Sequence, residues 1–574
     1  MSLLLIIIIC GVVLSLAYGV YGGFLFRWLR PDDRKTPAHA QYDGVDFVPA
    51  RTAVVTGQHF SAIAAAGPIV GPILAGLYFG WLPALLWILL GAIFVGGVHD
   101  MASLFASIRH RACSIAEVVR QRMSRSVYLV FLLFIWLSLV YVIIAFADLT
   151  AASFAKATSF SVSFGVGSES AISISGGGVA TAAVVYLGIS VLLGLITFRW
   201  KASLLPGAVV SVLVIGFAIW FGQRYPLNWP ATWNATKTWD WALLVYCFFA
   251  SILPMWLLLQ PRGFLGSLFL YAVLLVGIVG TIVGTFSSQL TLQFPMWRSE
   301  TSPIGPLFPF LFITIACGAC SGFHSIVSSG TTSKQLNCEK DIKPVAYGAM
   351  LLEAMVAVLA LLTLMVLPAT TSLKNPDAIF AQGIGRLLSF FGVPMEFAIT
   401  FGLLAFSTFI FDTLDVCTRL GRYVFQELFG LQGKWAGAWA TAATLAFPAI
   451  YLSVAPEGVW RQFWIIFGTS NQLLAALTLV GVSVWLKTQQ RNPWPALAPA
   501  IFMLVITGIA LFHSLSSFGK ILASSQKISS IIFLNFGITL VLLALGFFVT
   551  VQAFKILSLK PAAASDSSQA QINF

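Results

Sequence analysis

The sequence predicts an all-α polytopic membrane protein. The 574-residue chain has a mean hydropathy of +0.92, and 59% of its residues are hydrophobic. Only 9% are charged, whereas soluble domains carry about 25%. The apolar residues come in blocks of roughly 18–25, the length that crosses a bilayer as a helix. Only helices and closed barrels satisfy the backbone in lipid, and these blocks lack the alternation of barrel strands.

About fifteen apolar segments are long enough to be transmembrane helices. They are residues 3–26, 54–78, 83–107, 127–150, 181–198, 203–222, 241–259, 266–287, 307–328, 345–368, 393–414, 436–453, 463–485, 496–514 and 529–553. The first segment resembles a secretory leader, but it lacks a basic start and Arg27 and Arg30 follow it. We therefore expect a retained first helix.

The distribution of basic residues predicts the orientation. If the N-terminus is outside and every segment crosses, inside segments hold 23 of the 32 Lys and Arg residues. Cytoplasmic loops are enriched in these residues, so we expect the C-terminus to be cytoplasmic. The net charge of +12 then reflects anchoring at an anionic leaflet, and it predicts no nucleic-acid partner.

Few residues suggest a cofactor or a reaction. The seven cysteines show no disulfide-like spacing, and most lie in or beside apolar blocks. Cys317 and Cys320 form an isolated CxxC, for which a metal or redox role is the lesser alternative. HExxH, GxSxG and Walker patterns are absent from the sequence, so we expect neither an enzyme nor a cofactor.

Glycine and proline interrupt two of the predicted spans. Residues 54–78 contain Gly67, Pro68, Gly71 and Pro72, and the prolines remove two backbone donors. Residues 241–259 contain a similar interruption at Ser251, Pro254 and Met255. Broken helices bind solutes in many transporters, although small residues and proline also make simple packing kinks. A half-helix N-terminus at this point favours a carboxylate.

Counting gives a repeat hypothesis. If a core begins at residues 54–78, the segment 241–259 is its sixth helix. In a core of two five-helix repeats, the first and the sixth helix are equivalent, so both breaks fall at the start of a repeat. Because five is odd, the repeats are inverted, as in the LeuT-type fold. The sequence thus predicts a ten-helix core at residues 54–414, after an N-terminal helix and loop at 1–53. Additional helices occupy 415–560, and residues 561–574 form a disordered tail.

Ionisable residues at membrane depth are candidates for binding or for proton transfer, because burying a charge is costly. They are His59, His99, Asp100, Asp148, His324, Glu353, Asp412 and Asp415. Of the histidines, His59 lies on the first broken helix and His324 lies on residues 307–328, the eighth helix of the predicted core. The alternative is a structural ion pair, for instance of an inner carboxylate with Arg419 or Arg422.

Hydroxyl residues follow His324. In the LeuT-type fold, hydroxyls at the inner end of the eighth core helix bind sodium. Here Ser328, Ser329, Thr331 and Thr332 occupy that position. Oxygen ligands suit a hard cation, but hydroxyls near a helix end also act as caps. No metal site other than this sodium site is expected.

Several long motifs resemble the carbon starvation protein A family of bacterial membrane transporters. They spread over residues 40–480 and read DGVDFVP at 43–49, GQHFSAIAAAGPIVGP at 57–72 and LPMWLLLQPR at 253–262. Others are PFLFITIACG at 309–318, SGFHS at 321–325, SSGTT at 328–332, TLD at 413–415, TRL at 418–420 and GTSNQLLAA at 468–476. The family pattern has an acidic residue where this chain has Gly263, and often threonine in place of Asp412.

The resemblance implies a cation-coupled symporter of the bacterial inner membrane that imports peptides or pyruvate during carbon starvation. Its partners are then the solute, H+ or Na+, and the lipid bilayer. We expect the solute to contact His59, Gly67, Pro68, Gly71, Ser251, Pro254 and Met255. We expect Ser328, Ser329, Thr331, Thr332, His324, Asp412 and Asp415 to couple the cation or proton.

Two other functions remain as alternatives. A channel needs a repeated filter or rings of like charge, and neither is present in the sequence. A membrane-embedded nutrient sensor is disfavoured because no soluble segment exceeds about 35 residues, which leaves little room for a signalling domain.

Overall fold

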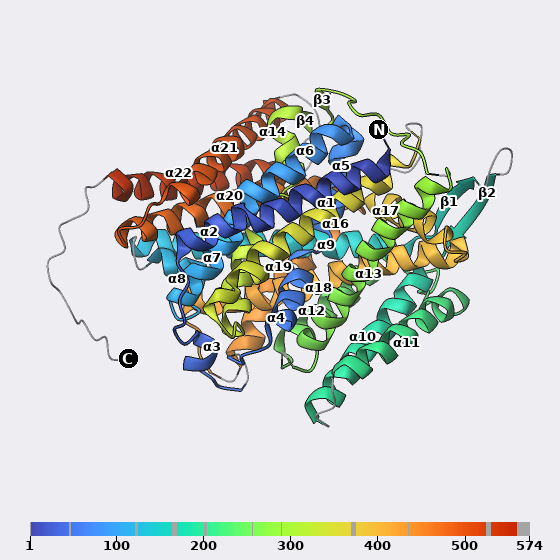
Figure 1. The fold of residues 1–574 in the computed structure, drawn as a ribbon, viewed down its shortest axis with the longest axis horizontal. Coiled ribbons are helices and arrows are strands. Elements are labelled where there is room, and N and C mark those ends of the chain that lie inside the picture. The colour runs from blue at the N-terminus through green and yellow to red at the C-terminus, as the bar shows by residue number, and fades with distance from the viewer. Residues whose placement is uncertain are drawn as a thin grey trace.

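The computed structural model describes residues 2–44, 47–120, 124–163, 169–199, 204–254, 256–288, 290–368, 375–433, 435–523 and 530–558. Within these residues the chain forms a bundle of helices (Figure 1), of which eleven are long and apolar enough to cross a membrane. A bent pair supplies a twelfth span. The polytopic helical architecture is confirmed; the count of fifteen spans stays a prediction, because 11 or 12 spans among the described residues are long and apolar enough. The segments 203–222, 241–259 and 307–328 do not qualify.

The first half of the chain begins with a peripheral span and then enters the bundle. Its helices are α1 (Leu3–Gly19), α2 (Tyr21–Leu29), α3 (Pro37–Ala40), α4 (Thr52–Ile63), α5 (Gly67–Phe79), α6 (Trp81–Gly91), the π-helical turn η1 (Ala92–Gly96), α7 (Gly97–Arg109), α8 (Ile115–Arg120), α9 (Arg125–Ala155), α10 (Gly176–Arg199), α11 (Leu204–Arg224), α12 (Ala235–Ile252) and α13 (Leu259–Phe286).

The second half contains the second interrupted helix and the remaining spans. It comprises α14 (Leu307–Thr314), α15 (Phe323–Gly330), the short turns η2 (Thr332–Lys334), η3 (Glu339–Asp341) and η4 (Lys343–Gly348), α16 (Ala349–Met365), α17 (Pro376–Ser389), α18 (Met395–Phe429), α19 (Ala436–Val454), α20 (Trp460–Thr488), α21 (Trp494–Ala523) and α22 (Ser530–Ser558).

Two short hairpins depart from a purely helical fold. Strand β1 (Thr158–Ser163) pairs antiparallel with β2 (Glu169–Ile174), with Thr158 opposite Ile174. Strand β3 (Thr301–Ser302) pairs with β4 (Gly305–Pro306). The first hairpin falls in the Ser- and Gly-rich loop between α9 and α10.

The predicted break in the first core helix is confirmed. Helix α4 ends at Ile63 and α5 begins at Gly67, and their axes differ by 44°. The intervening residues, Ala64–Ala66, are buried. Pro68 occupies the first turn of α5, where its missing N–H has no helical partner to lose.

The second break is not where the sequence predicts it. Helix α12 ends at Ile252, and Leu253, the residue before Pro254, is extended. Since a residue before proline disfavours the helical conformation, Pro254 ends this helix instead of breaking it in the middle. The segment predicted as one continuous span at 307–328 is interrupted instead, because residues 315–322 separate α14 from α15. Those eight residues include Gly318 and Gly322.

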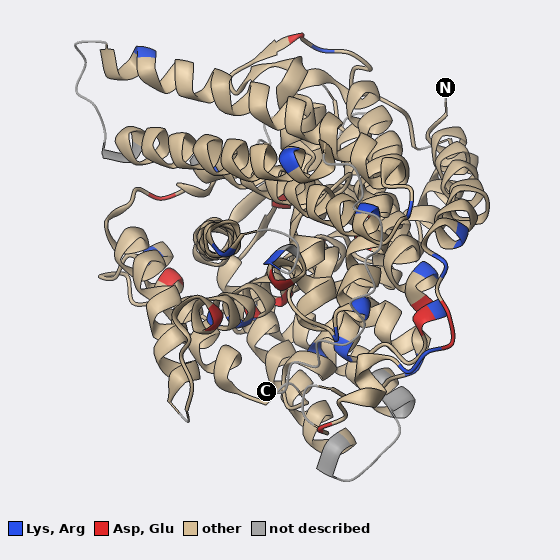
Figure 2. Ribbon diagram, turned by 90° about the vertical axis from the view of Figure 1, so that its left-hand side faces the viewer, with Lys and Arg blue, Asp and Glu red and all other residues tan. Residues whose placement is uncertain are grey.

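Burial separates inner from outer helices. The most apolar stretches of the spans containing α16, α18 and α20 are 89%, 83% and 94% buried, but those of α1–α2 and α22 only 33% and 28%. Helices α10 and α11 pack on each other at the edge of the bundle (Figure 1). Lys, Arg, Asp and Glu rarely interrupt the described helices (Figure 2), as expected for surfaces that face lipid.

Candidate functional site

The two interrupted helices lie directly against each other. A Cβ atom on Gly67 would lie 2.4 Å from Cys317 Sγ, and one on Gly71 would lie 2.5 Å from the carbonyl oxygen of Thr314. A Cβ atom on Gly318 would in turn lie 3.5 Å from the Cα of Pro68. The predicted residues Gly67, Pro68 and Gly71 are thus brought together with the 315–322 segment. These glycines are needed because backbones approach closely here.

Asn471 of α20 holds the second break in place. Its Oδ1 accepts a hydrogen bond from the backbone N–H of Phe323 at 2.9 Å, and its Nδ2 donates to Ser321 Oγ at 3.0 Å. Its carbonyl oxygen also accepts from the N–H of Gly322 at 3.1 Å. An amide from another helix therefore satisfies backbone groups that the interruption frees. Sequence reasoning missed this role, although Asn471 lies in the GTSNQLLAA motif.

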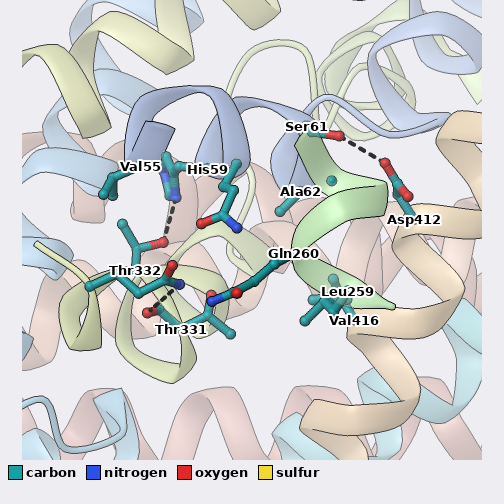
Figure 3. Close-up of a pocket in the computed structure, with 13 residues that line it drawn as sticks. Val55, His59, Ser61, Ala62, Leu259, Gln260, Thr331, Thr332, Asp412 and Val416 are labelled. Carbon is teal, nitrogen blue, oxygen red and sulfur yellow. Dashed lines mark hydrogen bonds between the residues drawn. The ribbon is translucent and has the colours of Figure 1, made fainter. Parts of the chain in front are cut away.

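A small cavity adjoins the first half-helix, between α4, α13, α18 and the segment after α15 (Figure 3). Its volume is about 40 Å³, enough for a few waters, since one water needs about 10–15 Å³. The lining residues are Val55, Gln58, His59, Ser61, Ala62, Leu259, Gln260, Gly263, Thr331, Thr332, Gln335, Asp412 and Val416.

Polar side chains on the cavity wall are only partly paired. His59 Nδ1 lies 2.9 Å from Thr332 Oγ1, and Ser61 Oγ donates to Asp412 Oδ2 at 2.8 Å (Figure 3). His59 Nε2 and Gln58 Oε1 have no hydrogen-bond partner among the described residues. Unpaired buried polar atoms carry a desolvation cost, so they indicate a place where water, an ion or a solute binds.

Behind Asp412, a buried arginine joins two carboxylates. Arg262 Nε lies 3.1 Å from Asp412 Oδ1, and Arg262 Nη1 contacts Asp415 Oδ2. Tyr246 donates to Asp415 Oδ2 at 2.7 Å, and the guanidinium carbon lies 5.0 Å from the Phe411 ring centre. Arg262 is 1% exposed. Asp412 thus shares its guanidinium with a second carboxylate, and a proton or cation bound at Asp412 relieves the repulsion between the two.

The inner carboxylates form their ion pairs with Arg262, whereas the alternative partner Arg419 remains an electrostatic neighbour of Asp415 and turns its Nη2 toward the backbone. Arg419 Nη2 donates to the carbonyl oxygens of Ala250 and Leu253, at 2.8 and 2.6 Å. It thereby caps the C-terminal end of α12. Arg262 stands in the motif LPMWLLLQPR, and that motif is the only sequence signal for its role.

The other predicted solute residues lie on different helices. Ser251 Oγ lies 3.1 Å from Thr441 Oγ1 of α19, and the carbonyl of Pro254 accepts from Leu257 N–H at 3.1 Å. Met255 falls outside the described residues. The structure thus groups Gly67, Pro68 and Gly71 with α14 and the 315–322 segment, and Ser251 with α19.

The predicted cation hydroxyls differ in their surroundings. Ser329 Oγ donates to Ser325 O at 2.8 Å, and Thr331 Oγ1 donates to Val327 O at 3.0 Å. Both hydroxyls therefore donate to carbonyl oxygens of their own helix, which fits the alternative that hydroxyls near a helix end satisfy the backbone. Thr331 and Thr332 line the cavity, whereas Ser328 is fully buried and its Oγ has no partner among the described residues.

His324 lies in a separate buried cluster. Its Nδ1 is 2.8 Å from Asp100 Oδ2, and its Nε2 is 3.2 Å from Glu353 Oε2. His99 Nδ1 lies 2.8 Å from Asp100 Oδ1. All four side chains are fully buried. The cluster joins α7, α15 and α16.

Ionic contacts at the ends of two spans join a loop to one end of the bundle. Arg109 approaches both carboxylate oxygens of Glu339, at 2.5 and 2.7 Å, and the backbone N–H of Asp32 donates to Glu339 at 2.7 Å. Arg34 hydrogen-bonds Asp32 and lowers the pKa of that carboxyl. We call Asp32, Arg109 and Glu339 the loop clasp. It ties the segment between α2 and α3 to α7 and η3.

Comparisons with known proteins show relatives of this chain. The sequence model of the family described as "Carbon starvation protein CstA" matches residues 2–378 and 368–510. "Peptide transporter CstA" of Bacillus subtilis is 31% identical and covers 97% of each chain. "Pyruvate/proton symporter BtsT" of Escherichia coli is 30% identical, over 89% of this chain and 81% of that protein.

Solved structures resemble the fold more distantly. A manganese transporter of Eremococcus coleocola covers 90% of this chain and 99% of its own, with a TM-score of 0.46 and 12% identity. A Na+-coupled sialic acid symporter covers 97% and 99%, with a TM-score of 0.41 and 12% identity. From the family match and the 31% identical relative, this chain belongs to the carbon starvation protein CstA family of membrane transporters.

Proposed function

We propose that the protein is a secondary active symporter that imports a small carboxylate-bearing nutrient, such as a peptide or pyruvate, together with H+ or Na+. The names of the relatives support this solute class, since one is a peptide transporter and another a pyruvate/proton symporter. We place the protein in the bacterial inner membrane, with the N-terminus outside and the C-terminus cytoplasmic. The loop charges support this orientation.

One observation carries the proposal: a partly unpaired polar cavity touches a buried ion cluster in which two carboxylates share one guanidinium. Asp412 lines the cavity and also lies 3.1 Å from Arg262. Asp415 contacts the same guanidinium and has Arg419 as a second electrostatic neighbour, so Asp412 is the less compensated of the two carboxylates. In a low-dielectric interior such a carboxylate favours binding of a proton or a metal cation.

This charge arrangement supplies a reason for coupling. A carboxylate-bearing solute entering beside Asp412 meets a like charge unless a cation binds with it. The cation and the solute therefore each strengthen the binding of the other, and that coupling is reciprocal by linkage. His59 and Gln58 offer unpaired polar atoms to such a solute, and both residues line the cavity.

We further propose a core of two inverted five-helix repeats, with different members from those that counting in the sequence gives. The first repeat comprises α4–α5, α6–α7, α9, α12 and α13, and the hairpin α10–α11 is an insertion. The second comprises α14–α15, α16, α18, α19 and α20. In this arrangement each repeat begins with a broken helix, and a short helix, α8 or α17, follows its second span.

The cavity of about 40 Å³ is small for either solute, so we propose alternating access in which α4 moves relative to α13 and α18. The path then runs from His59 past Gly67, Pro68 and Gly71 to the 315–322 segment. Thr331 and Thr332, which follow Ser328 and Ser329 in the sequence, line the end of this path at the cavity. Ser251 and Pro254 then belong to the helix end that Arg419 caps.

The test is uptake of radiolabelled pyruvate and of a radiolabelled dipeptide into proteoliposomes, with proton and sodium gradients imposed separately. A symporter accumulates one solute above its external concentration under one gradient. A channel only equilibrates the solute, and a sensor moves neither. Either result refutes the symporter for these two solutes.

A further inference from the structure

The Asp100, His324 and Glu353 cluster lies outside the cavity and takes no part in the Asp412 network. Glu353 comes from the middle of α16, Asp100 from α7 and His324 from the first turns of α15. All three are 0% exposed. Burial of three ionisable side chains is costly, so their arrangement needs a reason beyond packing.

Both ring nitrogens of His324 face carboxylates. Nδ1 lies 2.8 Å from Asp100 Oδ2, and Nε2 lies 3.2 Å from Glu353 Oε2. A neutral imidazole has only one N–H, so both contacts are attractive only if the ring is an imidazolium or if one carboxyl carries a proton. The site therefore holds a proton beyond those of a neutral ring and two carboxylates.

The two carboxylates are not equivalent. Asp100 also contacts His99 Nδ1 at 2.8 Å, so each of its oxygens faces a ring nitrogen. The contact of Glu353 Oε2 with His324 Nε2 at 3.2 Å falls short of good hydrogen-bond geometry, and Glu353 Oε1 has no partner among the described residues. An ionised carboxylate so poorly paired is strongly disfavoured in a dry interior, and protonation relieves that cost. Glu353 is therefore the group most sensitive to gaining or losing a proton.

The surroundings contain few other charges. The electrostatic neighbours of the cluster are His59 of α4, together with Cys317 and Cys320 of the second break. From α20, the nearby polar groups are uncharged, such as Thr478, which lies 3.2 Å from Ser325. His324 is then the cation on which the carboxylates depend. A sodium ion competes poorly here because an imidazolium repels it.

We propose that Asp100, His324 and Glu353 form a proton-binding site, with Glu353 as the residue that gains and loses the proton. When Glu353 is ionised and His324 is an imidazolium, the triad has a net charge of −1. One proton from water on the outer side makes it neutral, and release of that proton to water on the inner side restores the charge. Because α15 follows the second break, its movement changes the contact of His324 with Glu353.

This site deepens the proposed function, on which it rests, by naming the proton as a coupling ion and by locating it away from the cavity. The first test needs no solute. Infrared difference spectra of the reconstituted protein are recorded during a pH titration. A protonated carboxylic acid has a C=O stretching band that a carboxylate lacks. We expect a titrating band that disappears in Glu353→Gln and in Glu353→Met and remains in Glu396→Gln.

The control residue Glu396 is exposed in the first turn of α18. The use of two variants guards against failure of one to fold, which size-exclusion chromatography and thermal melting check. If the spectrum of wild-type protein minus that of either folded Glu353 variant contains no titrating carboxylic-acid band, the inference is wrong.

The second test uses radiolabelled pyruvate and a dipeptide in proteoliposomes. For the solute that the wild type carries, we compare the ratio of proton-driven accumulation to counterflow exchange between the wild type and each variant. We expect this ratio to fall several-fold in Glu353→Gln but not in Glu396→Gln. An equal ratio in wild type and Glu353→Gln overturns the coupling role. If the wild type carries neither solute, the proposed function fails, and the infrared result decides the proton site independently.

Discussion

Ser61 of the half-helix α4 donates a hydrogen bond of 2.8 Å to Asp412 Oδ2 of α18. Ser61 is 1% exposed, and it lies three residues before the first break begins at Ala64. The contact therefore joins the moving element of the proposed transport cycle to the carboxylate that lines the cavity. A change in the charge of Asp412 alters this bond directly and thereby the position of α4.

Removal of this hydroxyl is expected to weaken the junction. A hydrogen bond to a charged group contributes about 1.5–3 kcal/mol, so Ser61→Ala should lower the free energy of unfolding by that order. Equilibrium unfolding in detergent measures the change, and Ser453→Ala, at an exposed site on α19, is the control. Equal stability of Ser61→Ala and the wild type would show that the bond contributes nothing.

Removal of the buried arginine is expected to destabilise the protein more. Arg262→Gln leaves Asp412 and Asp415 without their cation, and breaking a buried pair costs about 3–5 kcal/mol. The second substitution Asp415→Asn removes one of the two carboxylates, so the double variant should recover part of the loss. A double-mutant cycle of unfolding free energies measures the coupling. Strict additivity of the two substitutions contradicts the ion cluster.

The crossing of the two breaks predicts different behaviour for its glycines. Gly67→Ala meets the Cys317 side chain at 2.4 Å, whereas Gly71→Ala meets the backbone carbonyl of Thr314 at 2.5 Å. A side-chain clash can be relieved by substitution, so Cys317→Gly should restore Gly67→Ala. The same change should not restore Gly71→Ala.

Thermal melting and the uptake of wild-type and variant protein measure this pattern. Gly508→Ala is the control because no atom lies within 4 Å of its added Cβ. If Cys317→Gly rescues both glycine variants or neither, the two breaks do not cross as described.

The loop clasp predicts a local effect on proteolysis. Glu339 is fully buried and pairs with Arg109 through both oxygens. Arg109→Gln removes the cation and should release the segment that contains Arg34 and Lys35. Trypsin is then expected to cleave there faster than in the wild type.

A matched control for the clasp is Arg224→Gln, at an exposed arginine at the end of α11. Mass spectrometry of the first tryptic fragments identifies the cleavage site. Equal cleavage after Arg34 or Lys35 in wild type and Arg109→Gln means that the clasp does not hold this segment.

The contrast between the two breaks shows what the sequence can predict. Two Gly-Pro pairs in one apolar run mark the break between α4 and α5, because proline removes backbone donors wherever it lies. The break at 315–322 contains no proline. Its small residues are equally typical of a continuous helix in close contact, so local sequence does not distinguish the two. The distinction depends on tertiary partners such as Asn471 and Gly67.

Pairing in the site is similarly beyond local sequence. Asp412, Asp415, His59 and His324 stand out because they are ionisable within apolar runs. Arg262 does not stand out, because an arginine near a helix end normally reaches the membrane interface. Its burial arises because α12, α13 and α18 pack around it. This packing brings Arg262 to Asp415, which lies 153 positions later in the chain.

The central claim, cation-coupled transport through the Asp412 network, is tested most directly by uphill accumulation in proteoliposomes. Uptake of radiolabelled pyruvate and of a dipeptide is compared between wild type and Asp412→Asn under a proton or a sodium gradient. The wild type is predicted to concentrate one solute under one gradient, and Asp412→Asn to lose that accumulation. Accumulation by Asp412→Asn equal to that of the wild type, or no response of the wild type to either gradient, would contradict the claim.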